Sequence, residues 1–296
     1  MPKTEHWQWY AEEFAPTERH EHAVEELLAA GRSQFQQYAV LRTPVFGKML
    51  VLDGDTQSSQ GDERIYHESL VHPAMAAADA LSEVLILGGG EGATLREALR
   101  HPGVARCTMV DIDGEVVELC KRHLPEWGAG AWDDPRARVI IGDALRFLRE
   151  DHDRYDVIIS DLTEPLPDSP SWPLFNGAVF RDIKARLSEG GVYVLQASTA
   201  AFHNMALHVK MARTLRNYFT YVRSYFAYVP AFDTAWAFLA CSDAVDVQAL
   251  SGERIARHVA ELRGENFYYD EETHRRLFAL PLYLRRALAE KGEVFS

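Results

Sequence analysis

Four apolar segments of the sequence are each followed by an acidic residue. The segments are 83–87, 107–110, 138–141 and 155–160, and the acidic residues after them are Glu91, Asp111, Asp143 and Asp161. If the segments are parallel strands of one sheet, their carboxyl ends meet at one edge, where ligands bind in open α/β sheets. Carboxylates gathered there would attract a cation and repel a phosphate. This pattern predicts a binding site for a positively charged ligand.

The glycine-rich segment 88–92 follows the first predicted strand. Its Gly88 and Gly90 belong to a G-x-G-x-x-A pattern, which is typical of dinucleotide-binding loops. Asp111 lies at about the spacing, roughly 20 residues, at which an acidic residue binds ribose hydroxyls. Glu91 inside the loop would repel a pyrophosphate, so we favour a nucleoside that carries a positive charge, such as a sulfonium, over a dinucleotide.

The elements that would position these residues alternate between strand and helix from about residue 62 onward. Helical segments are 65–80 (with a break or bend at Pro73), 93–100, 115–123, 144–150, 178–187 and 205–218. A fifth apolar segment, 192–196, follows the first four, and two later runs, 221–229 and 235–240, would extend the sheet at one edge. Apolar strands between amphipathic helices predict an α/β fold with a doubly wound, mostly parallel sheet.

Residues 1–60 have a different pattern and are predicted to form a small antiparallel β domain, with the catalytic domain at 61–296. Segments 34–41 and 48–52 are β-prone and are joined by a turn, whereas 21–30 has helical composition. Such a unit has exposed strand edges. We expect it to pair with its copy in a homodimer or homotetramer.

Composition excludes several classes of protein. The 296 residues carry a formal net charge of −13, which argues against nonspecific nucleic-acid binding. No apolar segment approaches the roughly 20 residues that cross a bilayer, and the amino terminus lacks a secretory apolar core. The three cysteines show no paired spacing, so we expect neither a disulfide framework nor a zinc site. We expect a cytoplasmic location.

Motifs along most of the chain occur together in one known family. They are F-G-K-M-L-V-L-D-G (46–54), T-Q-S (56–58), D-E-R-I-Y-H-E (62–68), G-G-G-E-G-A-T-L-R-E (88–97), V-D-I-D-G (110–114), D-D-P-R-A (133–137), Y-D-V-I-I-S-D (155–161) and F-A-L-P (278–281). In this combination the chain resembles the polyamine aminopropyltransferases, the spermidine synthase family. The resemblance implies a Rossmann-like catalytic domain of the methyltransferase type.

The resemblance also implies a reaction and its residues. A 3-aminopropyl group passes from decarboxylated S-adenosylmethionine, a co-substrate, to a polyamine or diamine, and methylthioadenosine is released without a metal or other cofactor. The implied donor-binding residues are Gln36, Gly88, Gly90, Glu91, Asp111, Asp143, Ala144 and Asp168. The implied acceptor-binding residues are Gln57, Tyr66, His67, Glu91, Asp161, Leu162, Thr163 and Glu164. Asp161 occupies the family's proton-acceptor position.

Elementary electrostatics agrees with this placement. The decarboxylated donor has a sulfonium and an ammonium but no carboxylate, so Glu91 would attract it and repel ordinary S-adenosylmethionine. An alkyl ammonium resembles lysine, with a pKa of about 10.4, so freeing its lone pair at neutral pH costs roughly 4 to 5 kcal/mol. We expect desolvation and hydrogen bonds to Tyr66 or His67 to offset this cost while Asp161 accepts the proton.

The acceptor is less well defined by the sequence. Glu164 stands where the usual family segment has aspartate, and Glu91 and the proline-rich segment 165–173 resemble thermospermine synthases and bacterial enzymes that use longer amines. Putrescine, which would yield spermidine, is therefore the leading acceptor, with agmatine and spermidine as alternatives.

Other interpretations remain open at this point. Asp143 alone is also compatible with a helix N-cap. Glu164 fits a solvated loop as well as a binding site, and His67 fits a side chain that its neighbours orient without proton chemistry. At the level of function, the alternatives are a methyltransferase that uses intact S-adenosylmethionine and a noncatalytic nucleoside-binding protein.

Overall fold

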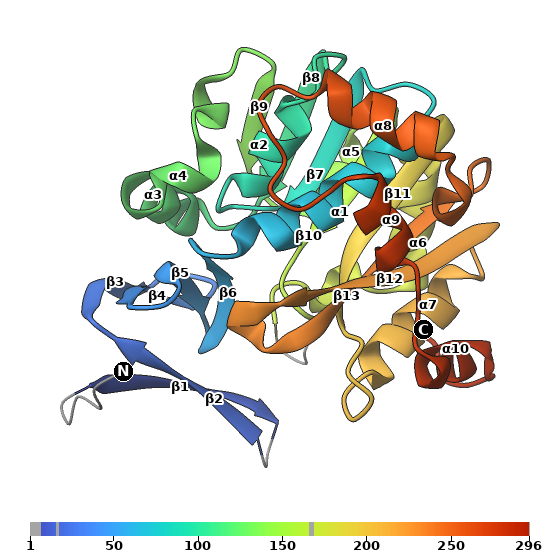
Figure 1. Ribbon diagram of the computed structural model, residues 1–296. Coiled ribbons are helices and arrows are strands. Elements are labelled where there is room, and N and C mark those ends of the chain that lie inside the picture. Colours follow the sequence, from blue (N-terminus) through green and yellow to red (C-terminus); the bar gives the residue numbers. More distant parts are fainter. Residues whose placement is uncertain (1–6, 16–17, 166–168, 296) are drawn as a thin grey trace.

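The computed structural model describes residues 7–15, 18–165 and 169–295, and its main body is a seven-stranded sheet (Figure 1). In chain order the strands are β7 (Glu83–Gly88), β8 (Arg106–Asp111), β9 (Ala137–Ile141), β10 (Tyr155–Asp161), β11 (Leu187–Thr199), β12 (Tyr221–Val229) and β13 (Thr234–Ser242). Strands β9, β8, β7, β10 and β11 are parallel neighbours, and β13 and β12 add an antiparallel edge. The predicted mostly parallel α/β sheet, extended at one edge, is confirmed.

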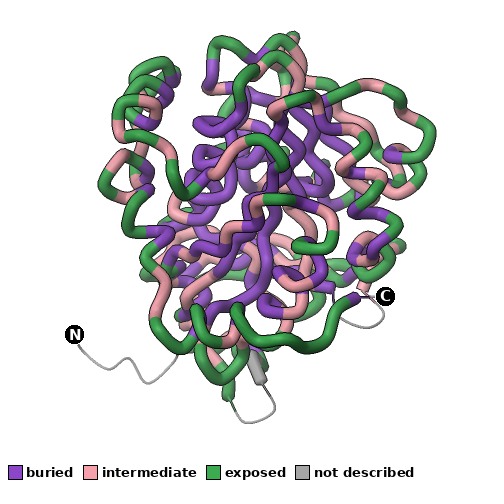
Figure 2. The backbone as a smooth tube through the Cα atoms, turned by 90° about the vertical axis from the view of Figure 1, so that its right-hand side faces the viewer, coloured by how far each residue is buried: buried purple, intermediate pink, exposed green. Residues whose placement is uncertain are grey.

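Helices cover both faces of this sheet. They are α1 (Glu63–Ala77), α2 (Ala93–Leu99), α3 (Gly114–His123), α4 (Pro125–Gly128), α5 (Ala144–Glu150), α6 (Gly177–Arg186), α7 (Ala206–Leu215), α8 (Gly252–Glu261), α9 (Glu271–Leu277) and α10 (Leu282–Ala289). Successive strand residues point to opposite faces, so Ile86 packs in one core cluster with α1 and α2, and Leu87 in another with α5, α6 and α7. Both faces of the sheet are therefore buried (Figure 2).

Helix α1 contains Pro73 without ending there, although the sequence predicted a break or bend. A proline inside a helix leaves the carbonyl four residues earlier without its usual donor. Here that carbonyl belongs to Ser69, and it accepts a hydrogen bond of 3.0 Å from the Tyr225 hydroxyl. A side chain from β12 thus replaces the missing backbone donor.

The amino-terminal strands form two smaller sheets. A hairpin of β1 (Gln8–Ala15) and β2 (Glu18–Val24) projects from the body, next to a four-stranded sheet of β3 (Glu26–Arg32), β4 (Gln37–Thr43), β5 (Gly47–Leu52) and β6 (Asp55–Ser59) (Figure 1). The helix predicted at 21–30 is wrong, because this segment belongs to β2 and β3. Its Glu, Leu and Ala composition favours a helix, but backbone pairing with β1 and β4 outweighs this weak local preference.

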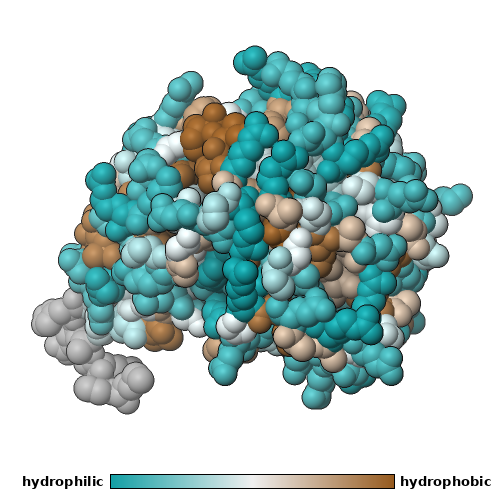
Figure 3. Space-filling model, turned by 90° about the horizontal axis from the view of Figure 1, so that it is seen from above, coloured by the Kyte–Doolittle hydropathy of each residue, from teal (hydrophilic) through white to brown (hydrophobic). Residues whose placement is uncertain are grey.

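The four-stranded sheet packs on the catalytic body through a shared apolar cluster. Leu50 of β5 contacts this cluster, which also contains Trp127 of α4 and Val116 of α3. This shared cluster fixes the position of the four-stranded sheet against the ends of the large sheet. Seen from above, the surface is mainly hydrophilic with separate hydrophobic patches (Figure 3). In the described part of the chain, no helix has the length and apolar character that a membrane span requires.

Candidate active site

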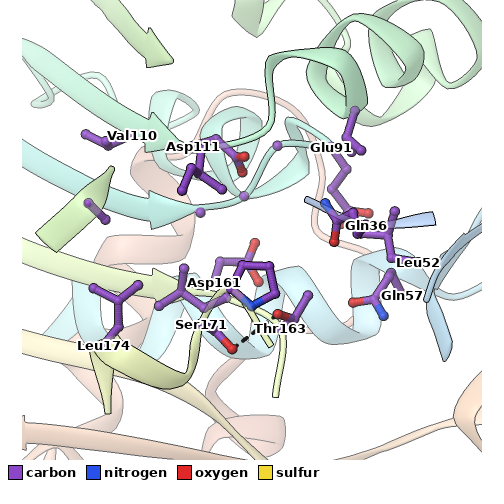
Figure 4. Close-up of a pocket in the computed structure, with 18 of the residues that line it drawn as sticks. Gln36, Leu52, Gln57, Glu91, Val110, Asp111, Asp161, Thr163, Ser171 and Leu174 are labelled. Carbon is purple, nitrogen blue, oxygen red and sulfur yellow. Dashed lines mark hydrogen bonds between the residues drawn. The ribbon is translucent and has the colours of Figure 1, made fainter. Parts of the chain in front are cut away.

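A pocket lies where the ends of strands β7 to β10 face the amino-terminal strands (Figure 4). The predicted residues that line it are Gln36, Gln57, Tyr66, Gly88, Gly90, Glu91, Asp111, Asp143, Ala144, Asp161, Leu162 and Thr163. His67 and Glu164 are not among the lining residues, and Asp168 lies outside the described residues. The strand-end carboxylates, expected to lie around one site, are all brought together.

Sequence reasoning missed the apolar walls of this pocket. They include Leu50, Leu52, Val110, Ile112, Val116, Pro170 and Leu174, with the polar Ser171 beside them. Val110 and Ile112 flank Asp111, so their place at the strand end was a usable signal. Leu50 and Leu52 come from a strand remote in sequence, and no local pattern links them to the site.

The charge of the pocket is one-sided. Glu91, Asp111, Asp143 and Asp161 line it, and none of the lining residues that the structure describes is Lys, Arg or His. Carboxylates that share a poorly solvated space repel one another unless a cation joins them. The pocket is therefore suited to a ligand with positive charge.

Among the carboxylates that line the pocket, Asp111 has a raised pKa. Burial raises the pKa of Asp111 to about 6, although backbone N–H groups of Asp113 and Gly90 donate to it. Repulsion from Asp113 and Asp161 contributes to this increase in the pKa of Asp111. A cation or hydroxyl donors in the pocket would stabilise the charged form.

Asp161 is held by two hydroxyl groups. Tyr66 Oη donates to Asp161 Oδ1 over 2.8 Å, and Thr94 Oγ1 donates to Asp161 Oδ2 over 2.5 Å. Burial and the nearby Asp161 raise the pKa of Tyr66 well above its ordinary value, so Tyr66 stays protonated and remains a donor. This arrangement fixes the orientation of the Asp161 carboxylate without neutralising its charge.

The glycine-rich loop is shaped by these carboxylates. Gly88 has a φ of +82°, and a Cβ there would lie 2.2 Å from the backbone oxygen of Asp161. A Cβ at Gly90 would lie 2.7 Å from Asp111 Oδ2. The two glycines therefore allow the loop to approach both acidic residues, which is a different requirement from access for a pyrophosphate.

Glu91 has partners for both of its oxygens. Its Oε1 lies 2.5 Å from Nε2 of His67, and its Oε2 accepts a hydrogen bond of 2.5 Å from Ser58 Oγ. His67 is fully buried, and its Nδ1 lies 3.0 Å from Glu63 Oε2. The neighbours thus orient His67, and the sequence analysis missed Ser58 and Glu63, which support Glu91 and His67 from outside the pocket.

Two further predicted residues, Asp143 and Gln36, make structural contacts as well as lining the pocket. Asp143 caps α5 by accepting a hydrogen bond of 2.8 Å from the Leu145 N–H, and it also lines the pocket. Gln36 donates from Nε2 to Asp113 over 3.0 Å, and Ser33 donates to the same Asp113 oxygen over 2.5 Å. The turn before β4 is thereby tied to the end of β8.

Comparisons with known proteins agree along the chain. Residues 63–249 match the spermine/spermidine synthase domain, and residues 8–60 match the spermidine synthase tetramerisation domain. A polyamine aminopropyltransferase of Sulfolobus acidocaldarius is 41% identical over 97% of this chain and 95% of that protein. Polyamine aminopropyltransferase 2 of Pseudomonas aeruginosa is 38% identical over 96% of this chain and 82% of that protein.

Solved structures show the same likeness. A crystal structure of spermidine synthase in complex with the transition-state analogue AdoDATO has a TM-score of 0.89 at 28% identity, over 95% of this chain and 94% of that one. The spermidine synthase of Thermotoga maritima has a TM-score of 0.87 at 28% identity, over 96% of this chain and 95% of that one.

Proposed function

The chain belongs to the spermine/spermidine synthase family and is an aminopropyltransferase, and we propose that its acceptor is a linear diamine or polyamine. The observation that supports this acceptor class is the set of carboxylates in the pocket, which has no basic side chain among the described lining residues. A polyamine is a chain of ammonium groups, so it complements this charge at more than one position.

Donor binding follows from the same residues. We propose that Asp111 accepts hydrogen bonds from the ribose hydroxyls, that Asp143 and Ala144 contact the adenine edge, and that Gln36 contacts the thioadenosine portion. Gly88 and Gly90 would bring the loop close to the nucleoside. Glu91 would face the donor's ammonium, and Asp168, which lies outside the described residues, remains a proposed donor-binding residue.

Asp161 is the proposed proton acceptor. The acceptor nitrogen attacks the aminopropyl carbon that is bonded to sulfur. The N–C bond forms as this C–S bond breaks, and neutral methylthioadenosine leaves. The proton of the attacking nitrogen passes to Asp161, whose orientation Tyr66 and Thr94 maintain. We propose that no metal or redox cofactor takes part, since the sulfonium already makes a neutral leaving group.

A second group of carboxylates beyond the pocket supports an acceptor with a distal positive charge. This distal carboxylate cluster consists of Glu12 in β1, Asp55 in β6 and Glu164 after β10. Glu12 is only 7% exposed, and its Oε2 has no hydrogen-bond partner. Burial, followed by repulsion from Asp55 and Glu164, raises the pKa of Glu12 to about 7.

The cluster adjoins the pocket at two places. Gln57, which lines the pocket, donates from Nε2 to the backbone oxygen of Asp55 over 3.1 Å, and Thr163 precedes Glu164. Burial and the Asp55 charge also raise the pKa of Glu164. We propose that the far ammonium of the acceptor balances these charges. Putrescine remains the first candidate, and agmatine and spermidine place charge further from the reacting nitrogen.

Product analysis tests this proposal. The enzyme is incubated with decarboxylated or intact S-adenosylmethionine and with putrescine, agmatine, spermidine or the monoamine n-butylamine, and products are identified by mass. We expect aminopropylated products from the decarboxylated donor and the acceptors that carry two or more positive charges. A methylated product from the intact donor, or equal turnover of n-butylamine, would contradict the proposal.

The variant Glu12→Gln tests whether the far ammonium of the acceptor binds at the distal carboxylate cluster. We expect kcat/KM to fall by about tenfold for the acceptor whose far ammonium reaches the cluster, which is the order of one charge-assisted hydrogen bond. The value for n-butylamine should be unchanged, because this amine has no second charge. An equal loss for all acceptors would indicate a structural defect instead.

Assembly and location complete the proposal. The match to a tetramerisation domain at residues 8–60 suggests oligomerisation, and we propose a homodimer or homotetramer. We also propose a cytoplasmic location, with which three unpaired cysteines are compatible.

A further inference from the structure

A closed network of hydrogen bonds and ion pairs surrounds Glu91 and joins the glycine-rich loop to three helices and one strand. Its members are Glu91 in the glycine-rich loop, Glu63 and His67 in α1, Arg96 in α2, Trp127 in α4 and Ser58 in β6. One half runs from Glu91 through the hydroxyl of Ser58, which accepts a hydrogen bond of 2.9 Å from Trp127 Nε1. This half connects the amino-terminal sheet to the glycine-rich loop.

The other half is ionic. The backbone oxygen of Trp127 accepts a hydrogen bond of 2.8 Å from Arg96 Nη1. Arg96 also donates to both carboxylate oxygens of Glu63, over 3.0 and 2.8 Å. Glu63 then contacts His67, and His67 contacts Glu91, which closes the network.

The surroundings of His67 favour a proton on each of its ring nitrogens, because each nitrogen lies against oxygen atoms. Nδ1 lies 2.7 Å from the backbone oxygen and 3.0 Å from a carboxylate oxygen of Glu63, and Nε2 lies 2.5 Å from Glu91 Oε1. A neutral imidazole has only one N–H, so one nitrogen would face oxygen acceptors without a proton. In the imidazolium, Nδ1 donates to Glu63, and the protonated Nε2 forms an ion pair with Glu91.

The charges around His67 favour this form. His67 is fully buried, which alone disfavours a positive charge, but the carboxylates of Glu91 and Glu63 outweigh burial and raise the pKa of His67 well above its ordinary value. Tyr66 packs edge-on with ring centroids 4.9 Å apart, and its own pKa is raised, so it contributes no charge. Arg96 lies behind Glu63 and compensates that second carboxylate.

We propose that Glu63 is a positioning residue for aminopropyl transfer: it keeps His67 doubly protonated, and His67 in turn holds Glu91 fixed and charge-balanced at the edge of the pocket. Glu63 itself does not line the pocket. The consequence is a division between the two acidic residues near the reacting groups. Glu91 is paired with a cation, whereas the Asp161 carboxylate is held, in the described part of the chain, by hydroxyl groups and remains free to take a proton. This inference rests on the proposed function only in its kinetic test.

The first test follows the protonation of His67 directly. Nitrogen-15 NMR of the histidine-labelled full chain, with the His67 signals assigned by His67→Gln, should show both ring nitrogens protonated from pH 6 to pH 8.5. This readout is independent of catalysis. If the wild-type His67 ring loses a proton near the ordinary histidine pKa of about 6.5, the proposal is wrong.

The second test uses Glu63→Gln and a matched control. Glu97→Gln removes a carboxylate that also pairs with Arg96 but does not contact His67. In Glu63→Gln we expect His67 to titrate near neutral pH, and kcat/KM to fall by about tenfold between pH 6 and pH 8.5 relative to the wild type. Glu97→Gln should keep the wild-type pH profile even if it is less stable. A wild-type profile in Glu63→Gln, or the same new titration in both variants, would overturn the inference.

Discussion

At the scale of single residues, the pocket assigns different tasks to chemically similar carboxylates. Asp161 accepts two hydroxyl hydrogen bonds, Glu91 is paired with a buried histidine, and Asp111 is buried enough to have a raised pKa. The sequence predicted that these residues share a site, because each follows a strand. It did not predict their differences, which depend on Thr94, Ser58 and other partners from distant segments.

The role of Asp161 leads to a direct prediction. Asp161→Asn should lower kcat by about 100-fold or more, the usual contribution of a general base, while the KM for the donor changes little. Steady-state kinetics with decarboxylated S-adenosylmethionine measures both values. For comparison, Asp143→Asn should act mainly on the KM for the donor. A kcat for Asp161→Asn within a few-fold of the wild type would contradict the assignment.

At the scale of elements, the catalytic strands and helices were predictable and the amino-terminal ones were only partly so. Segments such as 155–160 are buried on both faces and contain an apolar run, here 157–159, which is typical of a strand in a parallel sheet. Residues 21–30 carry helix-forming side chains but lie in β2 and β3, since their partners in β1 and β4 supply the hydrogen bonds. Such non-local pairing has no local signature.

The glycine-rich loop gives a prediction at this scale. In Gly90→Ala the new Cβ would meet Asp111 Oδ2 at 2.7 Å, so the Asp111 carboxylate must move. We expect the KM for the donor to rise by about tenfold with a smaller effect on the KM for the amine. Gly142→Ala is the control, because its Cβ would meet only Ile140, at 3.9 Å. An unchanged donor KM in Gly90→Ala would show that this contact is not needed.

At the scale of the whole molecule, buried histidines connect stability with pH. Burial, together with the nearby His72 and His101, lowers the pKa of His258 to about 2. The unfolded chain, with a histidine pKa of about 6.5, then binds more protons between these values. Stability contributed by neutral His258 is present above pH 6.5 and is lost as the pH falls below it.

The test compares how steeply the free energy of unfolding changes with pH in each protein, rather than its absolute value. Lowering the pH from 6 to 5 should reduce the free energy of unfolding by about 1 kcal/mol through His258 alone. His258→Phe should lack this part of the slope, whereas His203→Phe, at an exposed position, should retain the wild-type slope. Urea unfolding at several pH values measures it. Equal slopes for the wild type and His258→Phe would contradict the prediction.

The projecting hairpin gives a prediction about assembly. Trp9 of β1 and Leu27 of β3 are each 59% exposed, and they lie in the amino-terminal sheets, whose strand edges we expect to pair with a second copy. Multi-angle light scattering of the full chain should show a dimer or tetramer at micromolar concentration. Trp9→Glu should shift the distribution toward smaller species, and a wild type that is monomeric throughout would contradict the proposal.

The two halves of the pocket have separate origins in the chain, and this separation has a consequence for substrate preference. Residues proposed to contact the nucleoside lie mostly after strands of the large sheet, whereas Glu12, Asp55 and Gln57 belong to the first sixty residues. Substitutions at these three positions should therefore change the preference among amines, while the donor contacts in the large sheet stay in place.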